Sequence, residues 1–225
     1  MRTIKENVEN VRERIDRALS RSGRRDEVTL VAVSKTYPVD RINEAIRAGV
    51  RDIGENRVGE AEEKHPKIIE GARLHLVGHL QRNKVKRAVG LFSMIQSIDK
   101  VETALEMEKR AVFPVDILVE INASGEITKS GVTPEGLFDL VEQLKPLNMI
   151  RIRGLMTIGP FTENEAKIRE CFVLTRRKFE KLQKSEPGLD IKYLSMGMSS
   201  DYEIAIEEGS NMVRIGTAIF GTRSS

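Results

Sequence analysis

The chain has 225 residues, of which 40% are hydrophobic and 32% charged, and its formal net charge is +3 at pH 7. This length is enough to bury a substantial core. So small a net charge does not favour a nucleic-acid partner. The locally basic run at residues 81–87 lacks interleaved aromatic residues, so we expect it to be an exposed helix start rather than a surface for bases.

The single cysteine, Cys171, leaves no possibility of an internal disulfide bond and favours a reducing compartment. The first residues are charged from Arg2 onward and contain no apolar stretch, so we expect neither a secretory signal nor a membrane anchor. Together these features predict a cytoplasmic protein that has no membrane partner.

Apolar residues recur at helical spacing between residues 4 and 19, which predicts an amphipathic helix that ends near residues 22–23. The apolar, β-branched run at 28–33 is typical of a strand buried on both faces. From there, strands and helices alternate. Further strands are expected at 52–53, 74–77, 94–96, 115–121, 150–156, 193–195 and 212–215, and helices at 41–48, 58–69, 84–89, 100–110, 134–144, 163–183, 202–208 and 216–220.

Eight strand–helix units after one leading helix predict an α/β fold, the (β/α)8 TIM barrel. An open, doubly wound sheet usually has fewer strands and reverses its strand order at a switch point. No linker rich in Pro, Gly or Ser interrupts the pattern, so residues 1–225 are expected to form a single domain.

The active groups of such a barrel lie where strands end and loops begin. This rule singles out residues within or just after the predicted strands: Lys35, Asn56, His79, Met156, residues 195–200, Arg214, Gly216 and Thr217. Most other lysines fall on predicted helix faces, whereas Lys35 directly follows a buried strand. A partly desolvated lysine favours its neutral amine, which is a nucleophile for carbonyl groups. The alternative is an exposed loop lysine, and position alone leaves both open.

Two similar turns follow the seventh and eighth predicted strands. Residues 195–200 combine small hydroxyl side chains with a glycine before a helix, and Gly216 and Thr217 open the last helix. Helix starts present unpaired N–H groups, and the loops after strands seven and eight are the usual phosphate site of this fold. The alternative reading of the first turn is that Asp201 simply caps the helix that follows.

Arg214 interrupts an apolar strand, and a buried guanidinium needs a partner. One interpretation is a salt bridge, for example to Glu55. The other is a donor to a ring nitrogen or to an acidic substrate. His75 and His79 lie on a strand and its loop rather than on one helix face, so a metal pair is not expected.

Several stretches, in barrel order from end to end, carry a family resemblance: 32–35, 54–56, 75–81 with Asn83 and Lys84, 154–156, 194–199 with Asp201, and 213–217 with Phe220 and Gly221. In these the sequence closely resembles the pyridoxal phosphate homeostasis proteins, which are single-domain relatives of the N-terminal barrel of alanine racemase. The resemblance implies pyridoxal 5'-phosphate (PLP) as the cofactor, covalently bound to Lys35 as a Schiff base.

The resemblance also implies the roles of other residues. Arg214 is expected to hydrogen bond to the pyridine nitrogen, Ser199, Gly216 and Thr217 to anchor the phosphate, and three further residues to line the ring: Asn56, His79 and Met156. Arginine does not readily give up its proton, so the pyridine nitrogen should stay unprotonated, which weakens the cofactor as an electron sink.

Two functions from different classes remain. The first is a carrier that holds PLP and supplies it to PLP-dependent apo-enzymes; the second is an amino-acid racemase or related PLP enzyme. A racemase needs an acid/base group on each face of the substrate carbon. In alanine racemase a tyrosine from a C-terminal domain of the partner subunit supplies one of them. This sequence ends at Ser225 without such a domain, and Tyr37 shares a loop with Lys35. We therefore expect a carrier, and a monomer.

Overall fold

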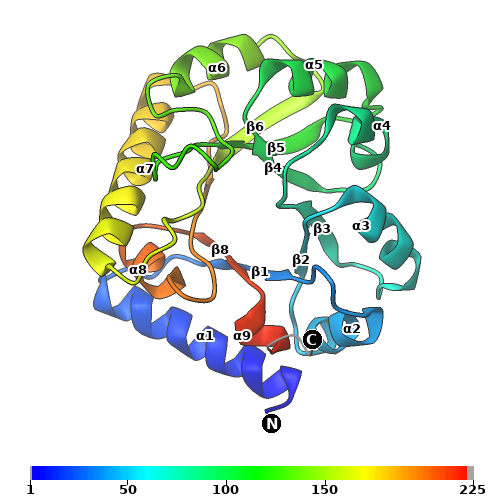
Figure 1. Ribbon diagram of the computed structural model, residues 1–225, viewed down its shortest axis with the longest axis vertical. Helices are drawn as coiled ribbons and strands as arrows, with labels where there is room; N and C mark the ends of the chain where they lie inside the picture. Colours follow the sequence, from blue (N-terminus) through cyan, green and yellow to red (C-terminus); the bar gives the residue numbers. More distant parts are fainter. Residues whose placement is uncertain (1, 222–225) are drawn as a thin grey trace.

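The computed structural model describes residues 2–221 and forms a closed parallel barrel in the strand order β1 to β8, surrounded by helices (Figure 1). The strands are β1 (Thr29–Val33), β2 (Asp52–Glu55), β3 (Arg73–Leu76), β4 (Met94–Ile98), β5 (Val115–Glu120), β6 (Ile150–Met156), β7 (Tyr193–Ser195) and β8 (Met212–Ile215). The predicted (β/α)8 barrel is therefore confirmed. Pairing of β1 with β8, which aligns Val31 with Arg214, closes the ring.

The helices follow the predicted order with shifted boundaries. They are α1 (Ile4–Arg21), α2 (Val39–Arg47), α3 (Val58–Lys64), α4 (Val85–Ala88), α5 (Val101–Arg110), α6 (Leu137–Leu144), α7 (Glu165–Ser185), α8 (Tyr202–Glu207) and α9 (Thr217–Phe220), with 3₁₀ turns at His65–Lys67 and Arg82–Lys84. The α-helix predicted over 58–69 ends early because Pro66 has no N–H to continue the ladder. The helix predicted from Pro134 begins three residues later, after a turn in which Gly136 N donates to Thr133 Oγ1 at 3.2 Å.

Two apolar cores result from the alternation of side chains along each strand. The larger one lies between the outer face of the barrel and the helices, and includes Ala32 and Ile53. The smaller one fills the barrel interior with Val31, Met94, Leu118, Met156 and Met212. The interior is thus a packed core rather than a channel, and polar groups placed within it need partners of their own.

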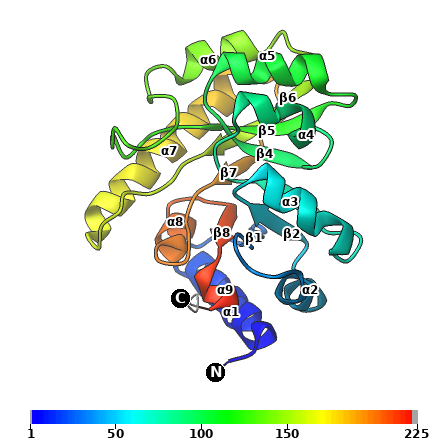
Figure 2. The ribbon, with the colours of Figure 1, turned by 45° about the vertical axis from the view of Figure 1, so that its right-hand side comes forward.

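The leading helix α1 packs on the outside of the barrel and lies beside α8 and α9 in both views (Figures 1 and 2). Thr3 and Glu6 form a capping box at its start, and its apolar face is buried. Asn7 Nδ2 donates to the carbonyl oxygen of Ile219 at 2.8 Å, which ties α1 directly to α9. The helix therefore supports the segment that follows β8.

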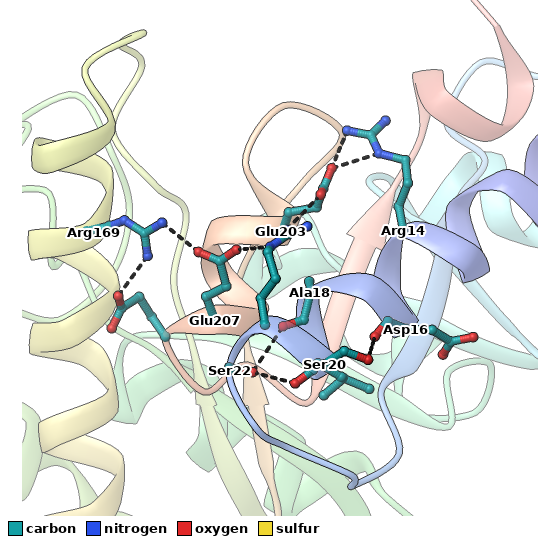
Figure 3. A network of polar contacts seen from close by, with 11 residues as sticks. Arg14, Asp16, Ala18, Ser20, Ser22, Arg169, Glu203 and Glu207 are labelled. Carbon is teal, nitrogen blue, oxygen red and sulfur yellow. Dashed lines mark hydrogen bonds and ion pairs between the residues drawn. The ribbon is translucent and has the colours of Figure 1, made fainter.

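Ion pairs hold α1 and α7 against α8 (Figure 3). Glu203 on α8 accepts from Arg14 Nε at 2.7 Å and from Arg21 Nη2 at 2.9 Å, and Arg169 on α7 pairs with Glu207 and Glu208. Although partial burial opposes it, hydrogen bonding from Arg21 and Arg14 keeps the pKa of Glu203 below its usual range. A connected network of this kind is worth more than an isolated surface pair.

We expect Glu203→Gln to lower the free energy of unfolding by about 1 kcal/mol, because it leaves two arginines without their shared carboxylate. Urea unfolding followed by circular dichroism measures this change. Glu13→Gln is the matched control, since Glu13 is exposed and its carboxylate pairs with Arg17, at 3.6 Å on the same helix. Equal effects of the two substitutions would contradict the clamping role of Glu203.

Candidate functional site

The loop after β1 places Lys35 in a turn with an uncommon backbone conformation. Ser34 is buried, Lys35 is half-buried, and Thr36 has a φ of 67° in the left-handed region. A β-branched residue is strained there unless its surroundings hold it. The backbone N–H of Thr36 donates to Glu60 Oε1 at 2.5 Å, so the carboxylate of α3 fixes the turn directly beside Lys35.

A largely buried ion cluster holds this turn in place. Lys64 Nζ lies 2.8 Å from Glu55 Oε1 and 2.6 Å from Glu60 Oε1, and it donates to the carbonyl oxygen of Ser34 at 2.9 Å. Ser34 Oγ also donates to Glu55 Oε1, at 2.6 Å. Burial raises the pKa of Glu55, although Lys64 and Ser34 oppose the shift. The backbone on both sides of Lys35 is thus anchored to β2 and α3.

Lys35 itself is not part of this cluster. None of the ion pairs found within residues 2–221 involves its amine. The neighbouring carboxylates of Glu55 and Glu60 form their ion pairs with Lys64 instead. Lys35 thus follows the carboxyl end of β1 without taking part in the ion cluster that holds its turn.

Arg214, on β8, is buried inside the barrel. Its Nη1 donates to Ser195 Oγ at 2.6 Å and its Nη2 donates to the carbonyl oxygen of Thr157 at 2.7 Å. The suggested salt bridge from Arg214 to Glu55 is wrong, because Glu55 pairs with Lys64 and, like Ile53 two residues before it, faces the helices rather than the barrel interior. Desolvation lowers the pKa of Arg214 to about 10, opposed by the charges of Glu120 and Asp201.

The loops after β7 and β8 are joined to each other. Arg214 N donates to the carbonyl oxygen of Gly197 at 3.0 Å, and Ala218 N donates to Ser199 Oγ at 3.3 Å. Gly197 has a φ of 95°, and a Cβ there would lie 2.6 Å from the Cβ of Ala205, so no larger residue fits. The hydroxyl of Ser199 and the start of α9 therefore belong to one structural unit.

Asp201 occupies the N-cap position of α8, but its side chain makes no capping hydrogen bond to that helix. It accepts from the backbone N–H of Met198 at 2.6 Å instead, and so closes the preceding loop. Burial raises the pKa of this carboxyl, opposed by the Met198 hydrogen bond and the charge of Arg214. The helix start was predicted correctly, whereas the carboxylate serves the loop after β7.

The remaining predicted residues lie at strand ends but differ in exposure. Gly216 opens α9 and a Cβ there would lie 3.4 Å from the carbonyl oxygen of Val33, so the start of α9 approaches the end of β1. Met156 is fully buried in the interior core. Asn56 is half-buried, and His79 and Thr217 are exposed.

Tyr37, two residues after Lys35, packs against the end of α9. Its hydroxyl donates to the carbonyl oxygen of Gly221 at 2.5 Å, and its ring stacks on Phe220 with centroids 4.8 Å apart. Arg41 Nη2 also donates to the carbonyl oxygen of Phe220, at 2.9 Å. The loop carrying Lys35 is thereby attached to α9, at the same end of the barrel as Arg214.

Sequence reasoning missed several polar groups inside the barrel. Gln96 on β4 and Glu120 at the end of β5 are buried, and His75 on β3 was considered only as a metal ligand. Burial, together with the negative charge of Asp99, raises the pKa of Glu120 to about 7 against the opposing effect of Arg214. The available signal was a polar side chain within an apolar strand at an inward-facing position.

No group of three or more His, Cys, Asp or Glu side chains arranged to hold a metal ion occurs within residues 2–221. In the same part of the chain, none of the helices has the length and apolar character needed to cross a bilayer.

Comparison with known proteins gives a consistent picture. The family model for the N-terminal domain of alanine racemase matches residues 3–224. The pyridoxal phosphate homeostasis protein of Aquifex aeolicus is 41% identical over 223 residues and the match covers 97% of both chains. The protein of that name from Escherichia coli is 40% identical, with 99% of this chain and 98% of the relative covered.

Solved structures agree with the sequence matches. PipY of Synechococcus elongatus superimposes with a TM-score of 0.88 without PLP, at 34% identity, covering 97% of this chain and all of PipY. With PLP bound, PipY gives a TM-score of 0.81 at 35% identity, covering 92% of this chain and all of PipY. Alanine racemase of Clostridium difficile is only 18% identical, with a TM-score of 0.73, and 58% of its chain is covered, which is a likeness of fold alone.

The raised pKa of Glu120 predicts a pH-dependent stability. A carboxyl whose folded pKa of about 7 exceeds its usual 4.5 stabilises the folded state only while it is protonated, and this contribution is lost as the pH rises through 7. Between pH 4.5 and pH 8 the wild type should lose about 3 kcal/mol of unfolding free energy that Glu120→Gln, which has no carboxyl at this position, does not lose. Urea titrations at the two pH values measure this loss, with exposed Glu135→Gln as the control. A constant difference between Glu120→Gln and wild type across this range would contradict the assignment.

Proposed function

Since the chain belongs to the family of the pyridoxal phosphate homeostasis proteins, we propose that it binds PLP as a Schiff base on Lys35 and supplies it to PLP-dependent apo-enzymes in the cytoplasm. The observation that carries this proposal is the placement of Lys35. Its amine is free of ion pairs within residues 2–221, on a strained turn that a buried cluster holds at the barrel mouth. PLP supplies an aldehyde that combines reversibly with such an amine.

The residues around Lys35 fit the remaining groups of this cofactor. Arg214 uses one N–H of each terminal nitrogen on Ser195 and Thr157, which leaves further N–H groups for an acceptor such as a pyridine nitrogen. Because β1 and β8 are paired, Arg214 on β8 lies beside the strand that leads into Lys35. A guanidinium that keeps its proton would leave the ring nitrogen unprotonated.

A phosphate group would fit between the loops after β7 and β8. The hydrogen bond from Ala218 N to Ser199 Oγ holds these loops together, and Gly216 brings the start of α9 close to β1. Ser199, Gly216 and Thr217 would then offer hydroxyl and backbone N–H donors. Met156 and Asn56 would line the ring, and the exposed His79 would stand at the rim.

The positions of the tyrosines support a carrier rather than a racemase. A two-sided racemase needs an acid/base group opposite the lysine. The hydroxyl of Tyr37 is bonded to Gly221, Tyr193 begins β7 at the amino end of the barrel, and Tyr202 is buried on α8 outside it. None of the three tyrosines is placed to face Lys35 across a substrate. A racemase remains the alternative function, and we propose that the carrier acts as a monomer.

We expect purified protein incubated with PLP to develop a visible absorption band that borohydride fixes, with a mass increase on the peptide containing Lys35. Lys35→Ala should show neither, while its unfolding free energy stays within about 0.5 kcal/mol of wild type, because the half-buried amine makes no ion pair. Exposed Lys86→Ala is the control and should behave as wild type. Labelling of a different lysine in the wild type would sink the assignment.

The carrier and the racemase are distinguished by α-proton exchange. Loaded protein in deuterated water should exchange the α-proton of alanine no faster than free PLP at the same concentration, because none of the three tyrosines lies opposite Lys35. Proton NMR follows the exchange. Sustained turnover that Tyr37→Phe abolishes would establish the racemase function instead.

A further inference from the structure

A chain of hydrogen bonds continues from Arg214 into the barrel interior. Ser195 Oγ, which accepts from Arg214 Nη1, donates to Gln96 Oε1 at 2.8 Å. Ser195 lies on β7 and Gln96 on β4, which β5 and β6 separate in the sheet, so this contact crosses the interior. All three side chains are at most 4% exposed. The partners of Arg214 are therefore held from the opposite wall of the barrel.

The hydrogen-bond chain then continues toward the amino ends of the strands. Gln96 Nε2 lies 2.9 Å from His75 Nδ1, and His75 Nε2 lies 2.9 Å from Asp52 Oδ1. Asp52 begins β2, and Arg73, which begins β3, donates to both of its carboxylate oxygens at 2.7 Å. The chain thus ends in an ion pair at the end of the barrel opposite Lys35.

The donors along this chain all point in one direction. The amide nitrogen of Gln96 only donates, so His75 Nδ1 is the acceptor and the ring proton sits on Nε2, where it faces the carboxylate of Asp52. The second N–H of Gln96 faces Met212 Sδ at 3.3 Å. The opposite amide orientation would aim the lone pair of His75 Nε2 at the Asp52 carboxylate, which is repulsive. Each group therefore donates to the next, from Arg214 down to Asp52.

Such a chain is not needed to fill space. Its neighbours in the interior are methionine, leucine and valine side chains, and apolar residues of similar volume would pack there without unpaired polar groups. Chains of aligned hydrogen bonds strengthen one another in a medium of low dielectric. The aligned acceptors thus hold the Arg214 guanidinium in one orientation and favour its charged form.

We propose that Ser195, Gln96 and His75 are positioning residues that fix Arg214 for the ring of the cofactor, through a one-way hydrogen-bond chain anchored on Asp52. This inference rests on the proposed function. None of the three residues needs to touch the ring, since they act through Arg214. Their substitution should therefore change the environment of the ring without preventing attachment to Lys35.

Two variants interrupt the hydrogen-bond chain at different links. Gln96→Met keeps the volume in an interior already rich in methionine and removes the link to both Ser195 and His75. Ser195→Ala disconnects Arg214 but leaves the contact between Gln96 and His75 in place. Thr175→Val is the matched control, because Thr175 is equally buried but bonds only to the carbonyl oxygen of Cys171 on its own helix.

The first readout needs no cofactor. The chain has three histidines, so nitrogen NMR of apo protein resolves the tautomer of His75. We expect the Nε2–H tautomer in wild type and in Ser195→Ala, and a mixture of tautomers in Gln96→Met. A wild-type His75 protonated on Nδ1 would overturn the one-way chain.

The second readout is the protein incubated with PLP. Both Gln96→Met and Ser195→Ala should still be modified at Lys35, but with a shifted visible band and an apparent Kd for PLP about fivefold weaker. Spectra and affinities identical to those of Thr175→Val would overturn the positioning role. A wild type that takes up no PLP overturns the proposed function itself, a result distinct from loss in the variants alone.

Discussion

A guanidinium inside a barrel packed with methionine, leucine and valine is stable only if its N–H groups find acceptors. Arg214 meets this requirement with the hydroxyl of Ser195 and the carbonyl oxygen of Thr157. Ser195 then needs an acceptor of its own, and Gln96 supplies one. Each buried polar group in the interior thus needs a hydrogen-bond acceptor, and the next group supplies it. The series ends at the Asp52–Arg73 ion pair.

The same reasoning explains the turn that carries Lys35. A left-handed Thr36 is unfavourable on its own, and it persists because Glu60 accepts its N–H while Lys64 neutralises Glu60 and Glu55. The lysine that is buried here is Lys64, which has three acceptors, and the lysine that is left free is Lys35. Two lysines in one neighbourhood therefore differ: Lys64 is bound by three acceptors, whereas Lys35 takes part in none of the ion pairs found within residues 2–221.

Local patterns in the sequence were sufficient for the order of the elements. The β-branched run of β1 and the apolar periodicity of α1 predicted both elements within a few residues, because these signals depend only on neighbours along the chain. The start of α6 was less accurate: the turn that Thr133 closes with Gly136 delayed this helix beyond Pro134. A side-chain to backbone hydrogen bond of this kind competes with the helix and is weakly encoded in periodicity.

The candidate site residues were named from the sequence, whereas the contacts among the buried polar groups were not predicted. Lys35 and Arg214 could be named because each stands out from an apolar strand, but the partner suggested for Arg214 was wrong. The choice between Glu55 and Ser195 depends on which face of each strand looks inward and on which strands oppose each other. The contact from Gln96 to Ser195 in particular exists only across a closed ring, so no pattern along either strand contains it.

The pairing of β1 with β8 has a consequence for how the protein comes into being. Lys35 follows the first strand to be synthesised and Arg214 lies on the last, so their two strands are brought together only when the ring closes. Contacts this distant along the chain form late in folding and slowly. The pairing that closes the barrel is therefore among the last features to be completed, and a nascent chain on the ribosome lacks the complete ring until β8 has emerged.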